Sequence, residues 1–318
     1  MSYNFKERKI VVIKRKTALE ELVLKFGTKE QAKFYIEHSG LSFDYYSKED
    51  AVYQESFKQL LLELDLLSIK RQVIDKEFLP NFLFAPDDII IVIGQDGMVA
   101  NTAKYLDNQP IIAVNPDPER IDGILLPFTV KDIANILEKT LKNEHKVRSV
   151  SMAQVELNNG QKLLAFNDFF IGAKSHVSAR YKIKYGKKEE NQSSSGIIIS
   201  TGAGSTGWLS SVFNMTNGIL KNFVDKNNEP MNVNIDMGLS WEAERLVFVV
   251  REPFKSVSSS TSISFGVINS NENMTIESKM ATGGIIFSDG IENDFLDFNS
   301  GLIAKVSLAK KSAKLVVK

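Results

Sequence analysis

The chain has 318 residues, a length that favours two domains, and its 39 basic residues are balanced by 39 acidic ones. This balance leaves no basic surplus of the kind that nucleic-acid-binding surfaces carry. The absence of cysteine excludes disulfides, zinc ribbons and cysteine nucleophiles, and it is consistent with a reducing compartment. The three histidines, His38, His145 and His176, are scattered, so a histidine-rich metal site is not expected.

Membrane association is not expected either. The longest apolar runs have the length of strands, well below the roughly 20 residues that a membrane-spanning helix needs. The first residues run directly into a strand-like segment at 10–13 and show neither a signal-peptide core nor an arginine-rich leader. We therefore expect a cytoplasmic protein with no nucleic-acid or membrane partner.

The first half alternates short aliphatic runs with helical patterns. Thr17 and Glu20 form a capping box for a helix that Gly27 can end, and Thr28 begins another helix. Aliphatic runs that bracket helices predict a parallel sheet covered on both faces. Helices are expected at 17–27, 28–40, 47–70 and 130–141, and buried strands at 10–13, 89–93 and 111–114.

The pattern changes after about residue 146. Extended segments flank Asn158-Asn159-Gly160, which predicts a hairpin with an Asn-Gly type of turn. The polar segment 186–195 is predicted to be a mobile loop, and 206–223 to be a helical insertion. Further strands are expected at 177–184, 196–200, 245–250, 262–268, 274–277 and 284–287.

These patterns predict an α/β N-terminal domain with a Rossmann-like parallel sheet, followed by a β-rich, sandwich-like domain. The expected boundaries are 1–146 for the first domain and 147–299 for the second. The remaining segment, 300–318, is expected to pack back on the N-terminal domain.

The segment Gly94-Gln95-Asp96-Gly97 follows a buried strand and precedes a helical pattern. In open α/β sheets, ligands bind beyond the carboxyl ends of the strands, and glycines there let backbone amides approach a phosphate. Asp96 could accept a hydroxyl proton, or orient a metal ion or a ribose. The alternative is an ordinary turn in which an Asp precedes a Gly.

A second glycine-rich segment lies in the β-rich half. Gly202, Gly204 and Gly207 spell G-x-G-x-x-G, and Asp225 lies near the offset at which a dinucleotide fingerprint has its acidic residue. Asp225 falls in a polar stretch instead of at a strand end, so a Rossmann NAD site is not favoured. A loop that wraps a ribose or phosphate fits better, since hydroxyl groups are present at Thr201, Ser205 and Thr206.

Polar residues also follow other strands. Asn167 beside Asp168 offers donors and paired acceptors that suit a ribose diol or an adenine edge, with an Asx turn as the alternative. Asn115 ends a strand before two prolines, and Arg120 could meet a phosphate or belong to a stiff surface loop. Asp289 ends another strand, and a tight turn is the default interpretation there. No Walker-type loop is present, and the few histidines do not support a Ser–His–Asp triad.

Taken together, these segments resemble the NAD kinase family, most closely its mitochondrial-type branch. The family's Gly-Gly-Asp-Gly-Thr signature is similar to residues 94–98, its Asn-Glu/Asp motif to 167–168, and its Thr-Gly-Ser loop to 203–208. Features typical of the branch are "VNPDPER", "NDFFIG…SARY", "REPF" with the serine run that follows, and "SDG". The resemblance covers residues from about 85 to 298.

The resemblance implies that the protein uses ATP and a divalent cation such as Mg²⁺ to phosphorylate NAD at the adenosine ribose 2′-hydroxyl, giving NADP. Asp96 would be the catalytic residue that receives or polarises the hydroxyl proton. The first domain would bind the nucleotide, the second NAD, and the chain would form a homodimer or a larger homo-oligomer. The resemblance assigns no metal ligand. The implied cofactor-binding residues are Gly94, Gly97, Asn115, Arg120, Asn167, Asp168, Thr201, Gly202, Gly204, Ser205, Thr206 and Asp289.

Two residues depart from the family signature. Gln95 replaces a glycine, which costs about 1–2 kcal/mol if φ is positive there and little if φ is negative. Met98 replaces a threonine and removes its hydroxyl. The alternatives are therefore a kinase of the same superfamily acting on a sugar or lipid, and a sensor that binds NAD or NADP without turnover. A dehydrogenase built on residues 202–207 is a more distant alternative.

Overall fold

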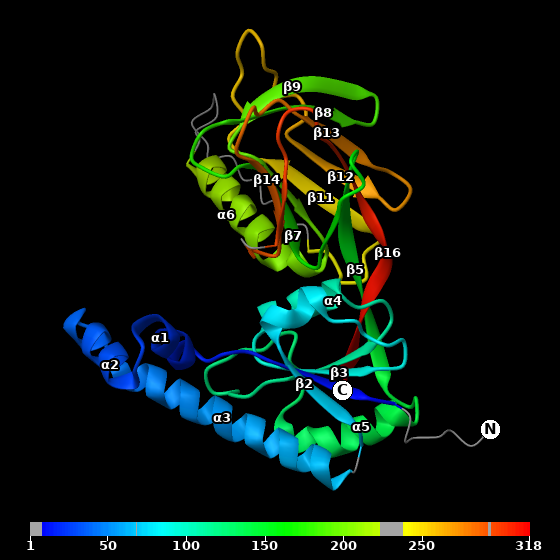
Figure 1. The fold of residues 1–318 in the computed structure, drawn as a ribbon. Helices are drawn as coiled ribbons and strands as arrows, with labels where there is room; N and C mark the ends of the chain where they lie inside the picture. The colour runs from blue at the N-terminus through cyan, green and yellow to red at the C-terminus, as the bar shows by residue number, and fades with distance from the viewer. Residues whose placement is uncertain (1–7, 68, 223–237, 292–293) are drawn as a thin grey trace. The chain divides into compact units, whose positions relative to one another are not determined.

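The computed structural model describes residues 8–67, 69–222, 238–291 and 294–318, which form two compact units (Figure 1). The described residues up to Arg148, together with Lys314–Lys318, form the first unit, and Ser149–Ala313 form the second. Two long strands, β5 (Lys146–Leu157) and β16 (Ile303–Val317), contribute residues to both units. No helix within the described ranges is long and apolar enough to cross a membrane.

The first unit contains a parallel sheet with the strand order β2-β1-β3-β4, next to which the end of β16 pairs with β4. The strands are β1 (Ile10–Lys14), β2 (Arg71–Asp75), β3 (Ile89–Ile93) and β4 (Pro110–Val114). Every residue of β3 is buried, as expected for a central parallel strand with both faces covered. The predicted parallel sheet is thereby confirmed.

Helices cover both faces of this sheet. Leu60 and Leu64 of α3 and Leu137 of α5 pack on alternate residues of β3, and α4 lies on the opposite side (Figure 1). The capping box is present, because Thr17 Oγ1 accepts the Glu20 amide and Glu20 Oε2 accepts the Thr17 amide. The helices are α1 (Ala18–Phe26), α2 (Lys29–His38), α3 (Phe43–Leu66), α4 (Asp96–Lys104) and α5 (Ile133–Leu141), with short 3₁₀ turns at Lys76–Asn81 and Val130–Asp132.

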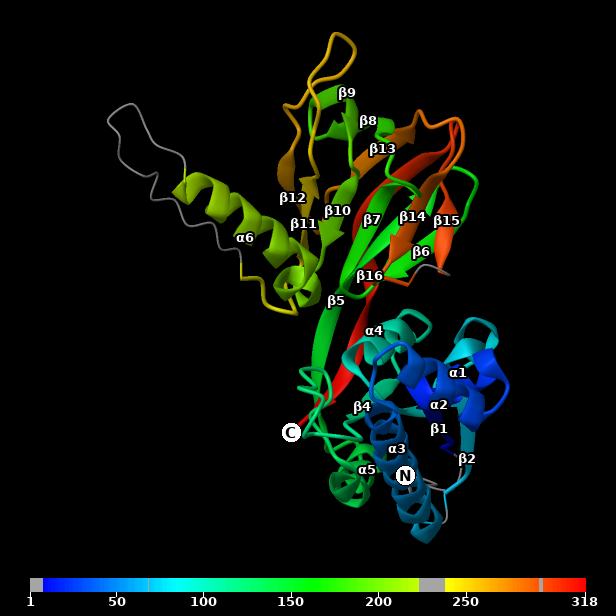
Figure 2. The same ribbon diagram turned by 90° about the vertical axis from the view of Figure 1, so that its left-hand side faces the viewer.

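The described part of the second unit is an antiparallel β-sandwich with the helix α6 (Trp208–Lys221), preceded by a short 3₁₀ turn at Ala203–Thr206 (Figure 2). One of its sheets continues from β16 through β13 and β8 to β9, with β5 and β6 attached, and the other has the order β12-β11-β10-β7-β14-β15. The remaining strands are β6 (Lys162–Ala165), β7 (Asp168–Ala173), β8 (Ala179–Tyr185), β9 (Lys188–Ser194), β10 (Ile197–Ser200), β11 (Arg245–Val250), β12 (Phe265–Asn269), β13 (Met274–Ser278), β14 (Gly284–Ser288) and β15 (Phe295–Asp297).

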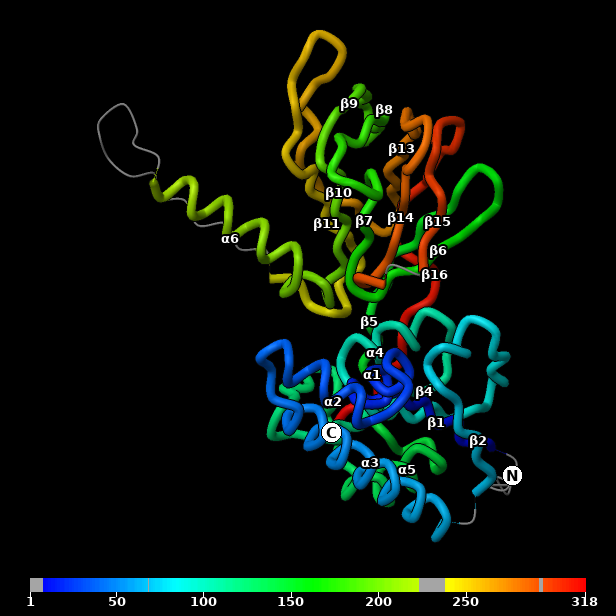
Figure 3. The backbone as a smooth tube through the Cα atoms, turned by 60° about the vertical axis from the view of Figure 1, so that its left-hand side comes forward, coloured from blue at the N-terminus to red at the C-terminus, as the bar shows by residue number. Residues whose placement is uncertain are grey.

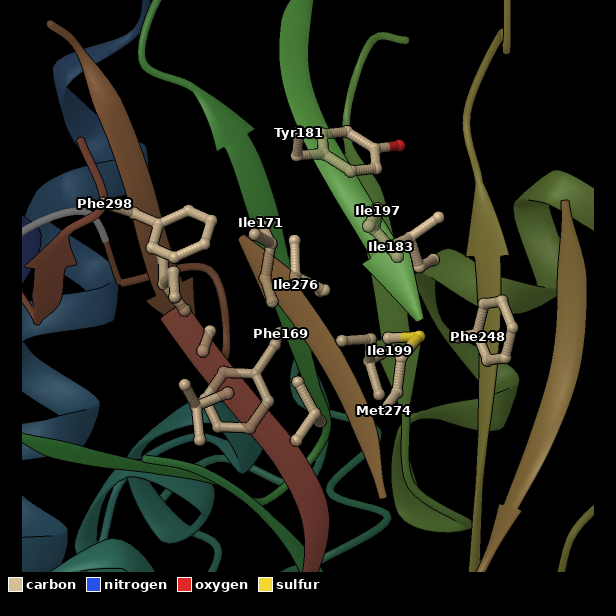
Figure 4. Packing of buried hydrophobic residues seen from close by; sticks show 14 of the residues in the cluster. Phe169, Ile171, Tyr181, Ile183, Ile197, Ile199, Phe248, Met274, Ile276 and Phe298 are labelled. Atoms are coloured by element: carbon tan, nitrogen blue, oxygen red, sulfur yellow. The ribbon is translucent and has the colours of Figure 1, made fainter. Parts of the chain in front are cut away.

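The core of the sandwich lies between the two sheets. Phe169 and Ile199 of one sheet belong to the same buried cluster as Ile183 and Met274 of the other (Figure 4). Alternate residues of each strand therefore enter a shared apolar layer, the arrangement that defines a sandwich. The β-rich second domain predicted from the sequence is confirmed.

The polar segment 186–195 was predicted to be a loop, and this prediction is wrong. Most of its residues form β9, which pairs with β8 from Tyr185↔Lys188 to Ala179↔Ser194, and the tube in Figure 3 shows the hairpin. The strand is stable despite its composition because its inward side chains are hydrogen-bonded. The Tyr181 hydroxyl lies 3.0 Å from Gln192 Oε1 and 2.7 Å from Ser194 Oγ.

The helical insertion predicted at 206–223 is α6, which begins two residues later, at Trp208. Its predicted end at Phe223, and Asp225, lie outside the described residues.

Replacing the buried Gln192 should destabilise the second unit. Its Nε2 donates to Ile263 O at 2.9 Å, and its Oε1 accepts from Tyr181, so Gln192→Ala removes the donor of the buried Ile263 carbonyl and leaves Tyr181 with Ser194 as its remaining partner. We expect urea unfolding to show a loss of about 2 kcal/mol in the free energy of unfolding. The neighbouring Asn191→Ala, at an exposed position of the same strand, should change it by less than about 0.5 kcal/mol. Equal losses for the two variants would contradict the assigned network.

Candidate functional site

The predicted site residues form two clusters, each built within one unit. The first cluster, at the carboxyl ends of β3 and β4, contains Gly94, Asp96, Gly97, Asn115 and Arg120. The second cluster, at the ends of β7, β10 and β14, consists of Asn167, Asp168, Thr201, Gly202, Gly204, Ser205, Thr206 and Asp289.

Asp96 is the first residue of α4 and lies just beyond the buried strand β3. Its Oδ1 accepts a hydrogen bond of 2.7 Å from the backbone amide of Leu125, in the segment that follows β4. This bond fixes one carboxylate oxygen, while the side chain as a whole stays half-buried. A carboxylate held in this way at the carboxyl edge of a parallel sheet can meet a bound ligand.

Gln95 and Met98, the two residues that differ from the NAD kinase signature, fit into the loop in different ways. Gln95 has φ −121°, so its Cβ introduces no backbone strain. Met98 is buried, and its sulfur would lie 2.6 Å from a Cβ placed on Gly94. A side chain at position 94 would therefore require the Met98 side chain to shift. By contrast, a Cβ on Gly97 would meet no atom within 4 Å, so the backbone there is open to a ligand.

Asn115 organises the segment that reaches Asp96. Its Nδ2 donates to Ile121 O at 2.8 Å, and its Oδ1 accepts the Asp117 amide at 3.0 Å. The side chain is buried, and this geometry gives it a loop-holding role. Arg120 is exposed, with its Nε 3.5 Å from Asp117 Oδ2. Cofactor contacts by Asn115 and Arg120 stay predictions.

In the second cluster, Asp289 holds the turn before β7. Its carboxylate accepts the backbone amides of Asn167 at 2.6 Å and Phe166 at 3.1 Å, with a longer contact of 3.4 Å to the Asp168 amide. Its own amide donates to Asp168 O at 2.9 Å. Asp289 adopts φ +56°, a strained conformation that these bonds stabilise. This geometry gives Asp289 a positioning role, and its contact with a cofactor stays a prediction.

The loop after β10 is bonded to the same turn. Thr201 donates through its hydroxyl to Phe166 O at 2.6 Å and through its amide to Asn167 O at 2.9 Å. A Cβ on Gly204 would lie 2.2 Å from Asn167 O, so this glycine is required for close backbone packing.

The other members of this loop differ in what surrounds them. A Cβ on Gly202 would lie 1.9 Å from Ser240 O, so backbone packing also requires a glycine there. The Ser205 hydroxyl donates to Gly202 O at 2.7 Å, whereas Thr206 is exposed. The packing thus explains two glycines of the G-x-G-x-x-G pattern without a dinucleotide. Ligand contacts by Thr201, Gly202, Gly204, Ser205 and Thr206 stay predictions.

Asp168 has an unusual environment. It is 9% exposed, and among the described residues no donor is hydrogen-bonded to its carboxylate. Burial, and secondarily the negative charge of Asp289, raise the pKa of Asp168 to about 7. A ligand that donates hydrogen bonds would stabilise the ionised carboxylate. A perturbed carboxyl group at such a place supports a functional site.

A charged group that was not predicted from the sequence lies beside Gly94. Arg15 directly follows β1, forms an ion pair with Glu49 and lies 4.7 Å from the centre of the Tyr53 ring. No motif marks these residues, because Arg15 and Glu49 are 34 positions apart. The position of Arg15 just after a predicted parallel strand is the one signal that could have indicated it.

The fold and the two clusters define a two-domain protein in which a parallel α/β unit and a β-sandwich each carry glycines and carboxylates at strand ends. No protein-family model matches the chain. A protein named NAD kinase from Clostridium kluyveri is 31% identical over 129 residues, which are 38% of this chain and 44% of that protein. One from Saccharolobus islandicus is 24% identical over 143 residues, 45% of this chain and 51% of that protein. The chain thus spans about half the length of these relatives or less.

Two solved structures share the fold. Yeast NADH kinase complexed with NADH aligns with 98% of this chain and 83% of its own, with a TM-score of 0.56 and 15% identity. An NAD kinase from Archaeoglobus fulgidus in complex with ATP aligns with 97% of this chain and 93% of its own, with the same TM-score and identity. The sequence similarity over part of the chain and the fold shared over most of it are both with proteins named NAD kinase or NADH kinase. They do not distinguish the mitochondrial-type branch.

The raised pKa of Asp168 predicts a pH-dependent stability. Between its ordinary value of 3.8 and about 7, the folded chain keeps a proton that the unfolded chain has lost. The stabilisation is therefore complete below about pH 4 and disappears as the pH rises through 7. In urea unfolding, the free energy of unfolding of the wild type relative to Asp168→Asn should fall by a few kcal/mol between pH 4 and 8.

Asp65→Asn is the control for this measurement. A hydrogen bond from Arg71 lowers the pKa of Asp65, so the wild type should lose stability relative to this variant as the pH falls through the acidic range. Asp168→Asn and wild-type curves that run parallel from pH 4 to 8 would show that Asp168 ionises normally in the folded chain.

Proposed function

We propose that the protein is an NAD kinase that transfers the γ-phosphoryl group of ATP to the 2′-hydroxyl of the adenosine ribose of NAD. The observation that carries this proposal is Asp96, held by Leu125 at the carboxyl end of a central parallel strand and flanked by the open backbone at Gly97. The names of the relatives and the fold shared with two NAD(H) kinases support it.

In the proposed reaction, Asp96 accepts a proton during transfer of the phosphoryl group. The 2′-oxygen attacks the γ-phosphorus, the bond between that phosphorus and the bridging β,γ-oxygen breaks, and ADP leaves. The hydroxyl proton passes to Asp96, whose Oδ1 is already fixed by Leu125 and whose second oxygen can receive it. Most of the acceleration comes from positioning and from stabilisation of charge on the phosphates.

The second unit supplies the NAD site in this proposal. Asp168 and Asn167 would bind the adenosine ribose or the base, on a turn whose backbone is fixed by Asp289 and Thr201. Ribose hydroxyls are donors, which suits a buried carboxylate that receives no hydrogen bond from the described part of the chain. Binding of NAD should therefore favour the ionised form of Asp168.

A divalent cation would be Mg²⁺ or a similar ion, which neutralises charge on the transferred phosphate. In the described part of the chain, no group of three or more acidic or histidine side chains could hold a metal ion. Mg²⁺ commonly binds through one or two carboxylates together with substrate phosphates, so it would enter with ATP. We assign it no protein ligand. A homodimer or larger homo-oligomer and a cytoplasmic location also belong to this proposal.

One observation favours a second candidate, a sensor that binds NAD or NADP without turnover. Met98 lacks the hydroxyl that the family signature places there, and its sulfur packs against Gly94. A sensor would bind the dinucleotide and form no product. A kinase acting on sugars or lipids would instead turn over those acceptors, so an acceptor panel separates all three candidates.

Asp96→Asn should abolish most NADP formation. Asparagine keeps an acceptor for Leu125 but cannot receive the proton, so kcat should fall by about 10²- to 10⁴-fold with little change in stability. The measurement is NADP produced from NAD, ATP and magnesium by the purified chain. Asp132→Asn is the control, since Asp132 also accepts a backbone amide, that of Thr129 at 2.7 Å. No NADP from the wild type while NAD still binds would support the sensor instead.

Gly97→Ala tests the approach of phosphate to the backbone. The added methyl group meets no protein atom within 4 Å and lies in a helix, so stability should be unchanged or slightly higher. Activity should fall at least tenfold, because the methyl group occupies space proposed for ATP. Gly218→Ala, at a similarly open position in α6, should keep full activity. Full activity in both variants would exclude a close phosphate at Gly97.

A further inference from the structure

Arg15 lies beside the glycine loop of the first cluster. It is the first residue after β1, and the parallel register Ile13↔Val92 brings it level with Gly94 on the neighbouring strand. A Cβ placed on Gly94 would lie 3.8 Å from Arg15 Cδ. The arginine stem therefore passes next to the loop that carries Asp96.

The Arg15 side chain is held rigidly. Its guanidinium lies over the Tyr53 ring at 4.7 Å and donates through Nη1 to Lys16 O at 3.0 Å. The Tyr53 hydroxyl accepts the Arg15 amide at 3.0 Å and donates to Ile93 O at 3.2 Å, so it joins the ends of β1 and β3. Most of the entropy of ordering this side chain is therefore lost before any ligand binds.

The charges of this group are only partly satisfied. Arg15 pairs with Glu49, and the two side chains are 11% and 17% exposed. Within the described part of the chain, Arg15 Nε and Glu49 Oε2 are buried without a hydrogen-bond partner. A buried ion pair with unsatisfied atoms contributes little to stability. Such atoms at the ligand-binding edge of a sheet point to a role in binding.

We propose that Arg15 binds a phosphate oxygen of ATP, and that Glu49 is its counter-ion while no nucleotide is bound. The proposal rests on the proposed function and assigns a residue to its donor site. A planar guanidinium suits phosphate, since it can donate two parallel hydrogen bonds. Tyr53 and Lys16 keep it in place, and Glu49 competes with phosphate for the same donors.

Competition between Glu49 and phosphate predicts opposite effects for the two partners. Arg15→Met should raise the KM for ATP at least tenfold and leave the KM for NAD within twofold. Glu49→Gln removes the competing charge and should lower the KM for ATP several-fold at low ionic strength. A pair with a purely structural role would give losses of the same direction in both variants, and would affect both substrates.

Two further variants distinguish the loss of a phosphate contact from misfolding of the chain. Arg15→Met leaves Glu49 buried and unpaired, so the double variant Arg15→Met/Glu49→Gln, which removes both charges, should fold and still bind ATP weakly. Arg15→Lys keeps the positive charge but loses the planar guanidinium that can donate two parallel hydrogen bonds. It should give a KM for ATP between those of the wild type and Arg15→Met. Arg71→Met is the matched control, since Arg71 pairs with Asp65 at the opposite end of the sheet, where β2 begins. Its KM for ATP should not change.

Calorimetric titration of the full chain with ATP separates this proposal from the proposed function. If the wild type forms no NADP, the kinase proposal fails. A phosphate contact would still be supported if ATP bound most tightly to Glu49→Gln, less tightly to the wild type and most weakly to Arg15→Met. If NADP forms but Arg15→Met and Glu49→Gln both weaken ATP binding, or neither changes it, the assignment of Arg15 is overturned while the kinase stands.

Discussion

The first cluster depends on the parallel pairing of β1, β3 and β4. The register Ile13↔Val92 and Ile93↔Val114 aligns the carboxyl ends of the three strands, so that Arg15, Gly94 and Asn115 emerge at one edge of the sheet. The strands are aliphatic and buried on both faces, and a shift in register would move the charged residues into that interior. Burial of the sheet therefore fixes the positions of Asp96 and Arg15 before any polar contact is made.

The second unit positions its polar residues by hydrogen bonds to backbone atoms across strand ends. Asp289 and Thr201 satisfy the amides and carbonyls of residues 166–168, and Gly204 allows the chains to approach closely. This arrangement has an electrostatic consequence, since it brings the Asp289 carboxylate near the buried Asp168. Both burial and the neighbouring charge raise the pKa of Asp168 to about 7. Asp289 thus fixes the turn and also adds to the effect of burial on the pKa of Asp168.

The sequence predicted those features that depend on neighbouring residues. The capping box of Thr17 and the aliphatic strand before Asp96 were predicted because their signals are local. Strand β9 was not, since its polar residues are stabilised by Tyr181 on another strand. The pairing of Arg15 with Glu49, and the bonds from Asp289 to amides more than 100 positions away, depend on the tertiary fold, so no local pattern contains them.

The departures at Gln95 and Met98 belong to one packing arrangement of the loop. Negative φ at Gln95 permits a side chain there without strain, whereas the sulfur of Met98 occupies the space that a side chain at position 94 would need. A side chain at position 94 would therefore displace the Met98 side chain. Because Gly97 stays open and Leu125 still holds Asp96, the change from threonine to methionine removes one hydroxyl without closing the loop. A guanidinium beside Gly94 would then supply a phosphate contact that the lost hydroxyl cannot.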